Sequence, residues 1–268
     1  MKYIFLNLKR FDVPKEKGGV NSISPIKNWG AYLTGSISKN LASYADFAQF
    51  AVFMPEAHIL NAKGQAIGVG CQGVHFENIR PDGNFGAFTT SLPAEAAGSL
   101  GCTWTIIGHC EERNKLKTIL RIGGGSEDAV TKILEKSVNC AIESGLKVLF
   151  CVGETADEQP AKEAVLKKQL EPVMGLENIV IAYEPVWAIG PGKTPPNEDY
   201  IRSIAAYIKS VVPFPVVYGG GLKKENAAML AGIETIDGGL IALTRFTGNI
   251  GFYPEEYLEI VAQYLGGS

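Results

Sequence analysis

Strand-like and helical segments alternate along the whole chain of 268 residues, and this alternation predicts an α/β protein folded as a closed (β/α)8 barrel. Most of the expected strands are short, apolar and uncharged, which is typical of parallel strands covered on both faces. We expect eight of them, at residues 3–8, 50–53, 66–70, 103–107, 147–151, 179–183, 215–218 and 239–243. No change in composition divides the chain, so we expect a single domain spanning residues 1–268.

The clearest helix is expected to begin at Ser126, a residue type that favours the N-cap position, with Glu127 and Asp128 in its first turn. Gly145 would end it, because glycine readily adopts the left-handed conformation that follows a helix. Its apolar residues fall on one helical face: Val130, Ile133, Leu134, Val138, Ala141 and Ile142.

A doubly wound open sheet is the alternative that alternating strands and helices also allow. The dinucleotide-binding version of that fold needs a G-x-G-x-x-G turn after its first strand, and this chain lacks one there. The barrel is therefore the favoured architecture. In a barrel, residues at the carboxyl ends of the strands meet at one mouth, however far apart they lie in sequence.

Composition excludes several classes of function. The formal charge of −3 leaves no basic footprint for nucleic acid, and no apolar run approaches the length of a membrane span. Met1 and Lys2 lead directly into a strand, so no signal peptide is expected. The five cysteines include no C-x-x-C pair, which indicates reduced thiols of a cytoplasmic protein and neither disulfides nor a zinc site.

The segment 182–194 carries the strongest chemical signal. An apolar run ends in a lone carboxylate, Glu184, which is followed by the rigid Pro185-Val186-Trp187 and a glycine-containing loop up to Lys193. A carboxylate at the end of a buried strand, beneath a loop that moves as one piece, suits a general base shielded from water. The alternative is a strand cap followed by an ordinary surface loop.

Several motifs resemble those of the triosephosphate isomerase family, in the family's order, from about residue 3 to residue 260. Segment 182–194 resembles the family's catalytic base and lid. The other matching motifs are Asn7-Leu8-Lys9, Ile106-Ile-Gly-His109-Cys-Glu111, Phe150-Cys-Val-Gly-Glu154, Tyr218-Gly-Gly220 and Asp237-Gly238.

The resemblance implies a role for each residue of the catalytic motifs. Glu184 would remove a proton from the carbon beside a carbonyl, neutral His109 would polarise that carbonyl, and Lys9 would stabilise the enediolate. Asn7 would donate to a substrate oxygen, and Glu111 would pair with Lys9 or with a backbone donor. A strand end for Asn7 and Lys9, a turn for His109 and a helix cap for Glu111 are the structural alternatives.

The resemblance also implies a lid over residues 185–194, stiffened by Pro191, in which the Gly190 amide donates to a phosphate. The expected phosphate site departs from the family pattern. Gly220 is followed by Gly221 where the family has serine, and Ala242-Leu243 occupy the place of a glycine pair. Thr244 and Arg245 follow, and Arg245 would either offer a charged donor to the phosphate or be a surface residue.

Other departures surround the expected mouth. Cys110 stands where the family has serine, Glu112 where it has arginine and Gly73 where it has asparagine, and extra residues appear at 13–24 and 114–125. These changes leave the acid–base residues in place. They bear on how the rest of the substrate, and a second subunit, would bind.

The expected function is that of an aldose–ketose isomerase acting on dihydroxyacetone phosphate and glyceraldehyde 3-phosphate, with no cofactor and no metal. The resemblance further implies a small sugar phosphate as ligand and a homodimer as assembly, and neither a nucleic acid nor a membrane is expected as partner. Two alternatives stay open at this point. One is an isomerase of a longer ketose phosphate, such as the four-carbon erythrulose phosphate, and the other is a catalytically silent barrel used for binding or assembly.

Overall fold

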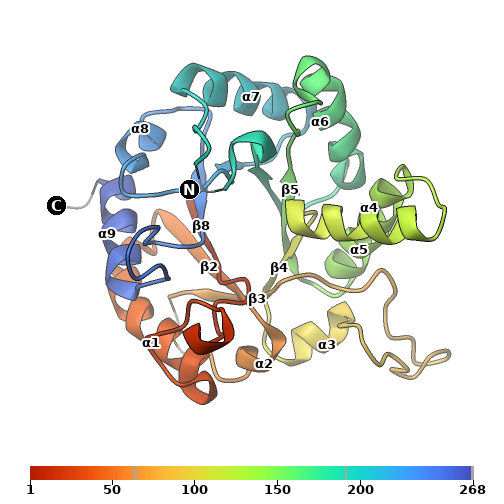
Figure 1. The fold of residues 1–268 in the computed structure, drawn as a ribbon. Coiled ribbons are helices and arrows are strands. Elements are labelled where there is room, and N and C mark those ends of the chain that lie inside the picture. The colour runs from red at the N-terminus through yellow and green to blue at the C-terminus, as the bar shows by residue number, and fades with distance from the viewer. Residues whose placement is uncertain (63, 65, 191, 267–268) are drawn as a thin grey trace.

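The computed structural model describes residues 1–62, 64, 66–190 and 192–266. Eight parallel strands hydrogen-bond in sequence order, and β8 pairs with β1 to close the barrel (Figure 1). The strands are β1 (Lys2–Asn7), β2 (Ala48–Met54), β3 (Gly68–Cys71), β4 (Trp104–Ile107), β5 (Lys147–Val152), β6 (Ile179–Tyr183), β7 (Val216–Tyr218) and β8 (Gly238–Ile241). The predicted (β/α)8 barrel is confirmed.

Helices surround the strands and cover their outer face (Figure 1). They are α1 (Trp29–Leu41), α2 (Glu56–Ile59), α3 (Ala94–Ser99), α4 (Cys110–Ile122), α5 (Ala129–Glu143), α6 (Lys162–Leu170), α7 (Glu198–Val211), α8 (Ala227–Ala231) and α9 (Pro254–Leu265). No helix within the described residues is both long and apolar enough to cross a bilayer.

Side chains fill the inside of the barrel, because alternate residues of each strand point inward. Phe5, Phe53 and Trp104 form the aromatic part of this inner core, with the ring centroids of Phe5 and Trp104 5.0 Å apart. Gly70 makes room for them, since a Cβ atom there would lie 2.6 Å from the ring of Phe53. The barrel is therefore a packed core, and chemistry is confined to its mouth.

The eight strands lie where the sequence predicts them, and every strand end is within two residues of its predicted position. One boundary bears on the site: β8 ends at Ile241, so Leu243 belongs to the following loop and not to the strand. The helix predicted to begin at Ser126 instead begins at Ala129, which is a correction. The hydroxyl of Ser126 accepts from the amide of Asp128 at 3.2 Å, so it caps the turn before the helix.

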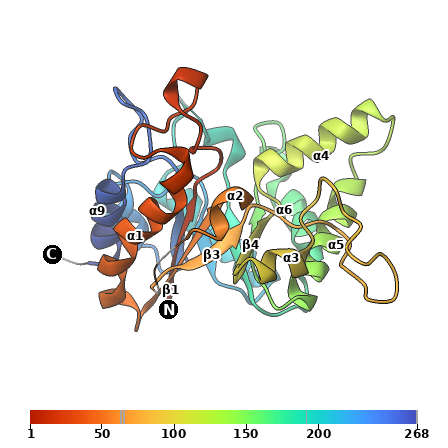
Figure 2. The same ribbon diagram turned by 90° about the horizontal axis from the view of Figure 1, so that it is seen from below.

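Two loops rise together on one side of the mouth, and α4 projects on the other side (Figure 2). The first loop, residues 10–24, contains buried Asp12, whose carboxylate contacts Nε2 of His58 at 3.1 Å and Arg10 at 2.8 Å. The second loop, residues 244–252, follows β8, and Asn249 accepts a hydrogen bond from Nζ of Lys15 at 3.2 Å. These two loops form one wall of the mouth.

Candidate active site

Asn7 and Lys9 lie where the chain leaves β1. The side chain of Asn7 is 5% exposed, and its Oδ1 accepts from the amide of Lys9 at 3.0 Å and from Nε2 of Gln72 at 3.3 Å. Gln72 also donates to the carbonyl of Lys9 at 2.9 Å. These bonds hold Lys9 at a φ of +40°, a left-handed conformation that is costly for a residue with a side chain.

His109 is the N-cap of α4, and this position determines its tautomer. Its Nδ1 accepts from the amide N–H of Glu111 at 3.2 Å, so the proton of the neutral ring belongs on Nε2. Burial, reinforced by the charge of Lys9, lowers the pKa of His109 to about 4. The ring is therefore neutral near pH 7, with an N–H donor facing the mouth.

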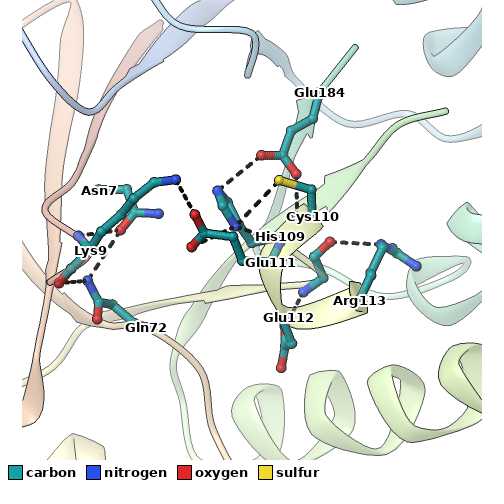
Figure 3. A network of polar contacts seen from close by, with 10 residues as sticks. Asn7, Lys9, Gln72, His109, Cys110, Glu111, Glu112, Arg113 and Glu184 are labelled. Carbon is teal, nitrogen blue, oxygen red and sulfur yellow. Dashed lines mark hydrogen bonds and ion pairs between the residues drawn. The ribbon is translucent and has the colours of Figure 1, made fainter. Parts of the chain in front are cut away.

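Glu184 immediately follows β6 and is 2% exposed. Its Oε2 accepts from the amide of Cys110 at 2.9 Å, and its Oε1 lies 3.2 Å from Nε2 of His109 (Figure 3). Burial raises the pKa of Glu184 to about 7, although the Cys110 amide and the charge of Lys9 act in the opposite direction. A carboxyl group with this pKa can accept and release a proton near neutrality.

Lys9 and Glu111 complete the group, with Nζ of Lys9 2.6 Å from Oε1 of Glu111. Burial alone would raise the pKa of Glu111, but the hydrogen bond and charge of Lys9 hold it below its usual value. The structure thus brings together, from the ends of β1, β4 and β6 and from the start of α4, all five residues that the sequence singles out for catalysis (Figure 3). A carboxylate base, a neutral N–H donor and an ammonium group form an arrangement suited to proton transfer beside a carbonyl.

Two charged residues of α4 support the turn after β4, Glu112 and Arg113, and the sequence alone indicated no role for either. Glu112 accepts from the amide of Gly108 at 2.6 Å, and Arg113 donates to the carbonyls of Gly108 at 2.7 Å and Cys151 at 2.8 Å. Gly108 has a φ of +78°, and a Cβ there would lie 2.8 Å from the Cys151 carbonyl oxygen. The two bonds from Arg113 tie the turn that presents His109 to the end of β5.

The expected lid is tied to β5 by a buried carboxylate, Glu154, which the sequence shows only as part of a motif. Its Oε1 accepts from Nε1 of Trp187 at 2.8 Å and from the hydroxyls of Tyr183 and Tyr200, each at 2.9 Å. Trp187 also packs edge-on against Tyr200, with ring centroids 5.7 Å apart. Gly190 is exposed, and Pro191 lies outside the described residues.

The loop after β7 contains the predicted phosphate-binding residues Gly220 and Gly221. Gly220 lies against Tyr218, where a Cβ would be 2.3 Å from the tyrosine oxygen, and Gly221 has a φ of +97°. The amide N–H groups of both glycines donate to no acceptor within the described residues. They are free to bind an anion at the mouth.

The loop after β8 is arranged differently, because its polar side chains bond to α9. The hydroxyl of Thr244 donates to Glu256 at 2.8 Å, and the guanidinium group of Arg245 pairs with the same carboxylate. Arg245 also lies over the ring of Tyr253, 3.9 Å from its centroid, while Leu243 is half-buried. In this arrangement the charge of Arg245 is neutralised by Glu256.

His109, Cys110 and Glu184 each offer a metal-ligand atom, and these atoms lie within 4.8 Å of one another. Their protonation makes them poor ligands. Nε2 of His109 carries the ring proton because Nδ1 accepts from Glu111, and burial together with the charge of Glu184 raises the pKa of the Cys110 thiol to about 12. A metal would have to displace both protons and break the helix cap.

Comparisons with known proteins point to one family. The family model described as triosephosphate isomerase matches residues 27–249. The triosephosphate isomerase of Chlorobium phaeovibrioides is 35% identical over 214 residues, covering 74% of this chain and 76% of its own. That of Cupriavidus pinatubonensis is 31% identical over 262 residues, covering 88% and 96%.

A solved structure agrees on the fold. The triosephosphate isomerase of Bartonella henselae superimposes with a TM-score of 0.71 and covers 98% of this chain and 99% of its own. Its sequence is 24% identical, so the likeness concerns the barrel alone.

Proposed function

Because the chain belongs to the triosephosphate isomerase family, we propose that it is an aldose–ketose isomerase that interconverts dihydroxyacetone phosphate and glyceraldehyde 3-phosphate. The observation that carries the proposal is the contact between Glu184, whose pKa is raised to about 7, and the neutral His109. A weak acid and a neutral N–H donor at one point can together move a proton between neighbouring carbons.

In the proposed mechanism, Glu184 removes a proton from C1 of dihydroxyacetone phosphate while Nε2–H of His109 donates to the oxygen on C2. Negative charge develops on that oxygen and is stabilised by His109 and by the ammonium group of Lys9. Glu184 then returns the proton to C2. His109 gives its Nε2 proton to the oxygen on C2 and takes up the hydroxyl proton of C1, which leaves an aldehyde at C1. These residues supply every proton acceptor and donor of the step, so the reaction requires no cofactor.

A longer ketose phosphate is the second candidate substrate. Two departures from the family pattern in the expected phosphate-binding loops favour it. Gly221 offers no hydroxyl, and Thr244 and Arg245 are both bonded to Glu256. In a longer substrate the phosphate lies farther from the reacting carbons, so these loops would have to bind it at a different position. The carbon chemistry at Glu184 and His109 would be the same.

A coupled assay tests the proposal. Dihydroxyacetone phosphate formed from glyceraldehyde 3-phosphate is reduced by glycerol-3-phosphate dehydrogenase, and four-carbon ketose phosphates are followed in parallel by NMR. A Glu184→Gln protein purified in the same way measures any contaminating isomerase. Turnover of triose phosphate above that background supports the first candidate, turnover of four-carbon substrates alone supports the second, and turnover of neither leaves the barrel as a binding or assembly protein.

The proposed biological unit is a homodimer in the cytoplasm. The loop between β3 and α3 exposes Phe76 (38% exposed) and Phe85 (79% exposed), and α4 exposes Ile119 (55%) and Ile122 (83%). The β3–α3 loop and α4 lie on the same side of the barrel (Figure 1), and exposed apolar side chains of this size on one side favour burial against a second subunit. Sedimentation equilibrium of the purified protein tests this part of the proposal.

A further inference from the structure

We infer that Lys223 is the cation that recognises the substrate's phosphate in this protein. The inference rests on the function proposed above and names a binding residue for it. Lys223 lies in the loop after β7, and the loops after the seventh and eighth strands are where barrels of this type place phosphate groups.

The stem of Lys223 lies directly beside the loop glycines. Its Cε is 3.4 Å from the position that a Cβ atom would take at Gly221. The amide of Leu222, the residue between them, donates to the carbonyl of Leu240 at 3.0 Å, and the Asn226 side chain bonds to the Gly221 carbonyl and to the Lys223 amide. The lysine stem therefore lies in van der Waals range of the glycine position, and these bonds hold the loop backbone from which the stem extends.

The ammonium group of Lys223 lies over an aromatic ring from the neighbouring loop. Its Nζ is 4.0 Å from the ring centroid of Phe246, within the range of a favourable cation–π contact. A ring face neutralises no charge and satisfies at most part of the three N–H donors of an ammonium group. The contact thus positions the cation between the loops after β7 and β8 and leaves N–H groups for an anion.

Lys223 differs from its charged neighbours in having no acidic partner. Lys224 pairs with Glu259 at 2.7 Å, and Arg245 pairs with Glu256. No carboxylate within the described parts of the chain lies at ion-pair distance from Lys223. Of these three cations, Lys223 alone can meet a phosphate without first breaking an ion pair.

The amides of Gly220 and Gly221 add neutral donors beside this charge, since neither has an acceptor within the described residues. A phosphate held by these amides and by the Lys223 ammonium group would have both the hydrogen bonds and the charge that a dianion requires. Lys223 would in this way compensate for the missing serine hydroxyl at position 221. A site that depends more on charge and less on neutral donors should be more sensitive to salt.

The test measures binding of inorganic phosphate by calorimetry and KM for glyceraldehyde 3-phosphate. Lys223→Gln removes the charge and keeps a polar side chain, and Lys223→Arg restores the charge. Lys224→Gln is the matched control, because it removes an adjacent lysine that already has a partner. Thermal unfolding of each variant confirms that it folds.

We expect Lys223→Gln to weaken phosphate binding and raise KM by about tenfold, since the contact is charge-assisted. Lys223→Arg should recover most of the affinity, and Lys224→Gln should change it by less than about twofold. Phe246→Leu, which removes the ring, should weaken binding by about threefold. In wild type, affinity should fall steeply as salt rises, and this slope should flatten in Lys223→Gln.

The inference is overturned if Lys223→Gln leaves the affinity for phosphate unchanged. It is also overturned if Lys224→Gln weakens phosphate binding as much as Lys223→Gln does. Its failure is distinguishable from failure of the proposed function. If wild type turns over triose phosphate and Lys223→Gln does so with unchanged KM, the isomerase assignment stands and the role of Lys223 does not. If wild type binds phosphate through Lys223 but turns over no triose phosphate, the anion site stands and the isomerase assignment fails.

Discussion

Oε1 of Glu184 lies 3.2 Å from Nε2 of His109. The proposed base therefore contacts the same N–H group that must donate to the substrate carbonyl. The other oxygen of Glu184 is held by the amide of Cys110. For the reaction to occur, the carboxylate must leave both partners and turn toward the substrate carbon. Because Glu184 directly precedes the lid, movement of the lid would also rotate the Glu184 side chain toward the substrate.

Replacing Glu184 with Gln should lower the isomerase rate by at least about 10²-fold, because glutamine cannot accept the carbon-bound proton. The fold should survive, since the amide keeps the size and most hydrogen-bonding positions of the carboxylate. The coupled assay gives the rate, and circular dichroism gives the folded fraction. A variant with near-normal turnover would show that another residue is the base.

The pH dependence of kcat/KM should show an acidic limb near pH 7. Glu184 must be ionised to act as a base, and burial raises its pKa to about 7, so activity should rise as pH increases through that value. A phosphate monoester has its own second pKa of about 6. A limb at pH 6 would therefore assign the titration to the substrate and contradict the raised pKa.

Lys9 allows stability and activity to be separated by two variants. Lys9→Gly should increase the free energy of unfolding by about 0.5–1 kcal/mol, because the relief of left-handed strain exceeds the entropic cost of glycine. Lys9→Met should leave stability nearly unchanged, since it keeps the strain and loses only a half-exposed ion pair. Both should lose activity; urea unfolding that ranks the two variants equally would contradict the strain argument.

Activity should persist in excess EDTA. The ring proton of His109 belongs on Nε2, and the Cys110 thiol has a pKa raised to about 12, so neither is ready to bind a metal. The assay is run after dialysis against chelator, with a zinc-dependent enzyme treated alongside as control. Loss of activity that a divalent metal restores would contradict the proposed mechanism.

Millimolar phosphate should protect the described part of segment 185–194 from hydrogen exchange, because closure over the anion buries its amides. Trp187 is bonded to Glu154 in this structure, so Trp187→Phe should change the protection of this segment without changing exchange in β5. Exchange measured by mass spectrometry gives both quantities. Identical exchange with and without phosphate would argue against a lid.

Sequence patterns predicted the barrel because most of its strands are short and apolar and its motifs fall at strand ends. The same reasoning placed Glu184, His109 and Lys9 at one mouth. It could not supply the raised pKa of Glu184 or the φ of Lys9, because each depends on contacts between segments far apart in sequence. The tautomer of His109 depends instead on the helix cap that its Nδ1 makes with the Glu111 amide. The start of α5 was wrong for a local reason, since Ser126 caps a turn as readily as a helix.

The phosphate loops show a different kind of limit. The sequence makes Arg245 a candidate phosphate ligand. In the structure its side chain pairs with Glu256 on α9 and lies over Tyr253, and no sequence pattern predicts this pairing. In the sequence, Lys223 is a lysine that follows a glycine loop, and such a residue is usually solvated. Only the structure shows that its ammonium group lies over Phe246 and its stem beside Gly221, which makes it a candidate phosphate ligand.

The hydrogen bond between Lys15 and Asn249 links two surface loops that differ in origin along the chain but share one function as a wall of the mouth. The first is anchored by buried Asp12, and the carbonyl of Val20 would lie 3.4 Å from a Cβ at Gly251 in the second. A change in the length of one loop would therefore remove a contact that supports the other. Descendants of this protein should gain or lose the two loops as a pair, and a chimaera carrying only one of them should unfold at that wall first.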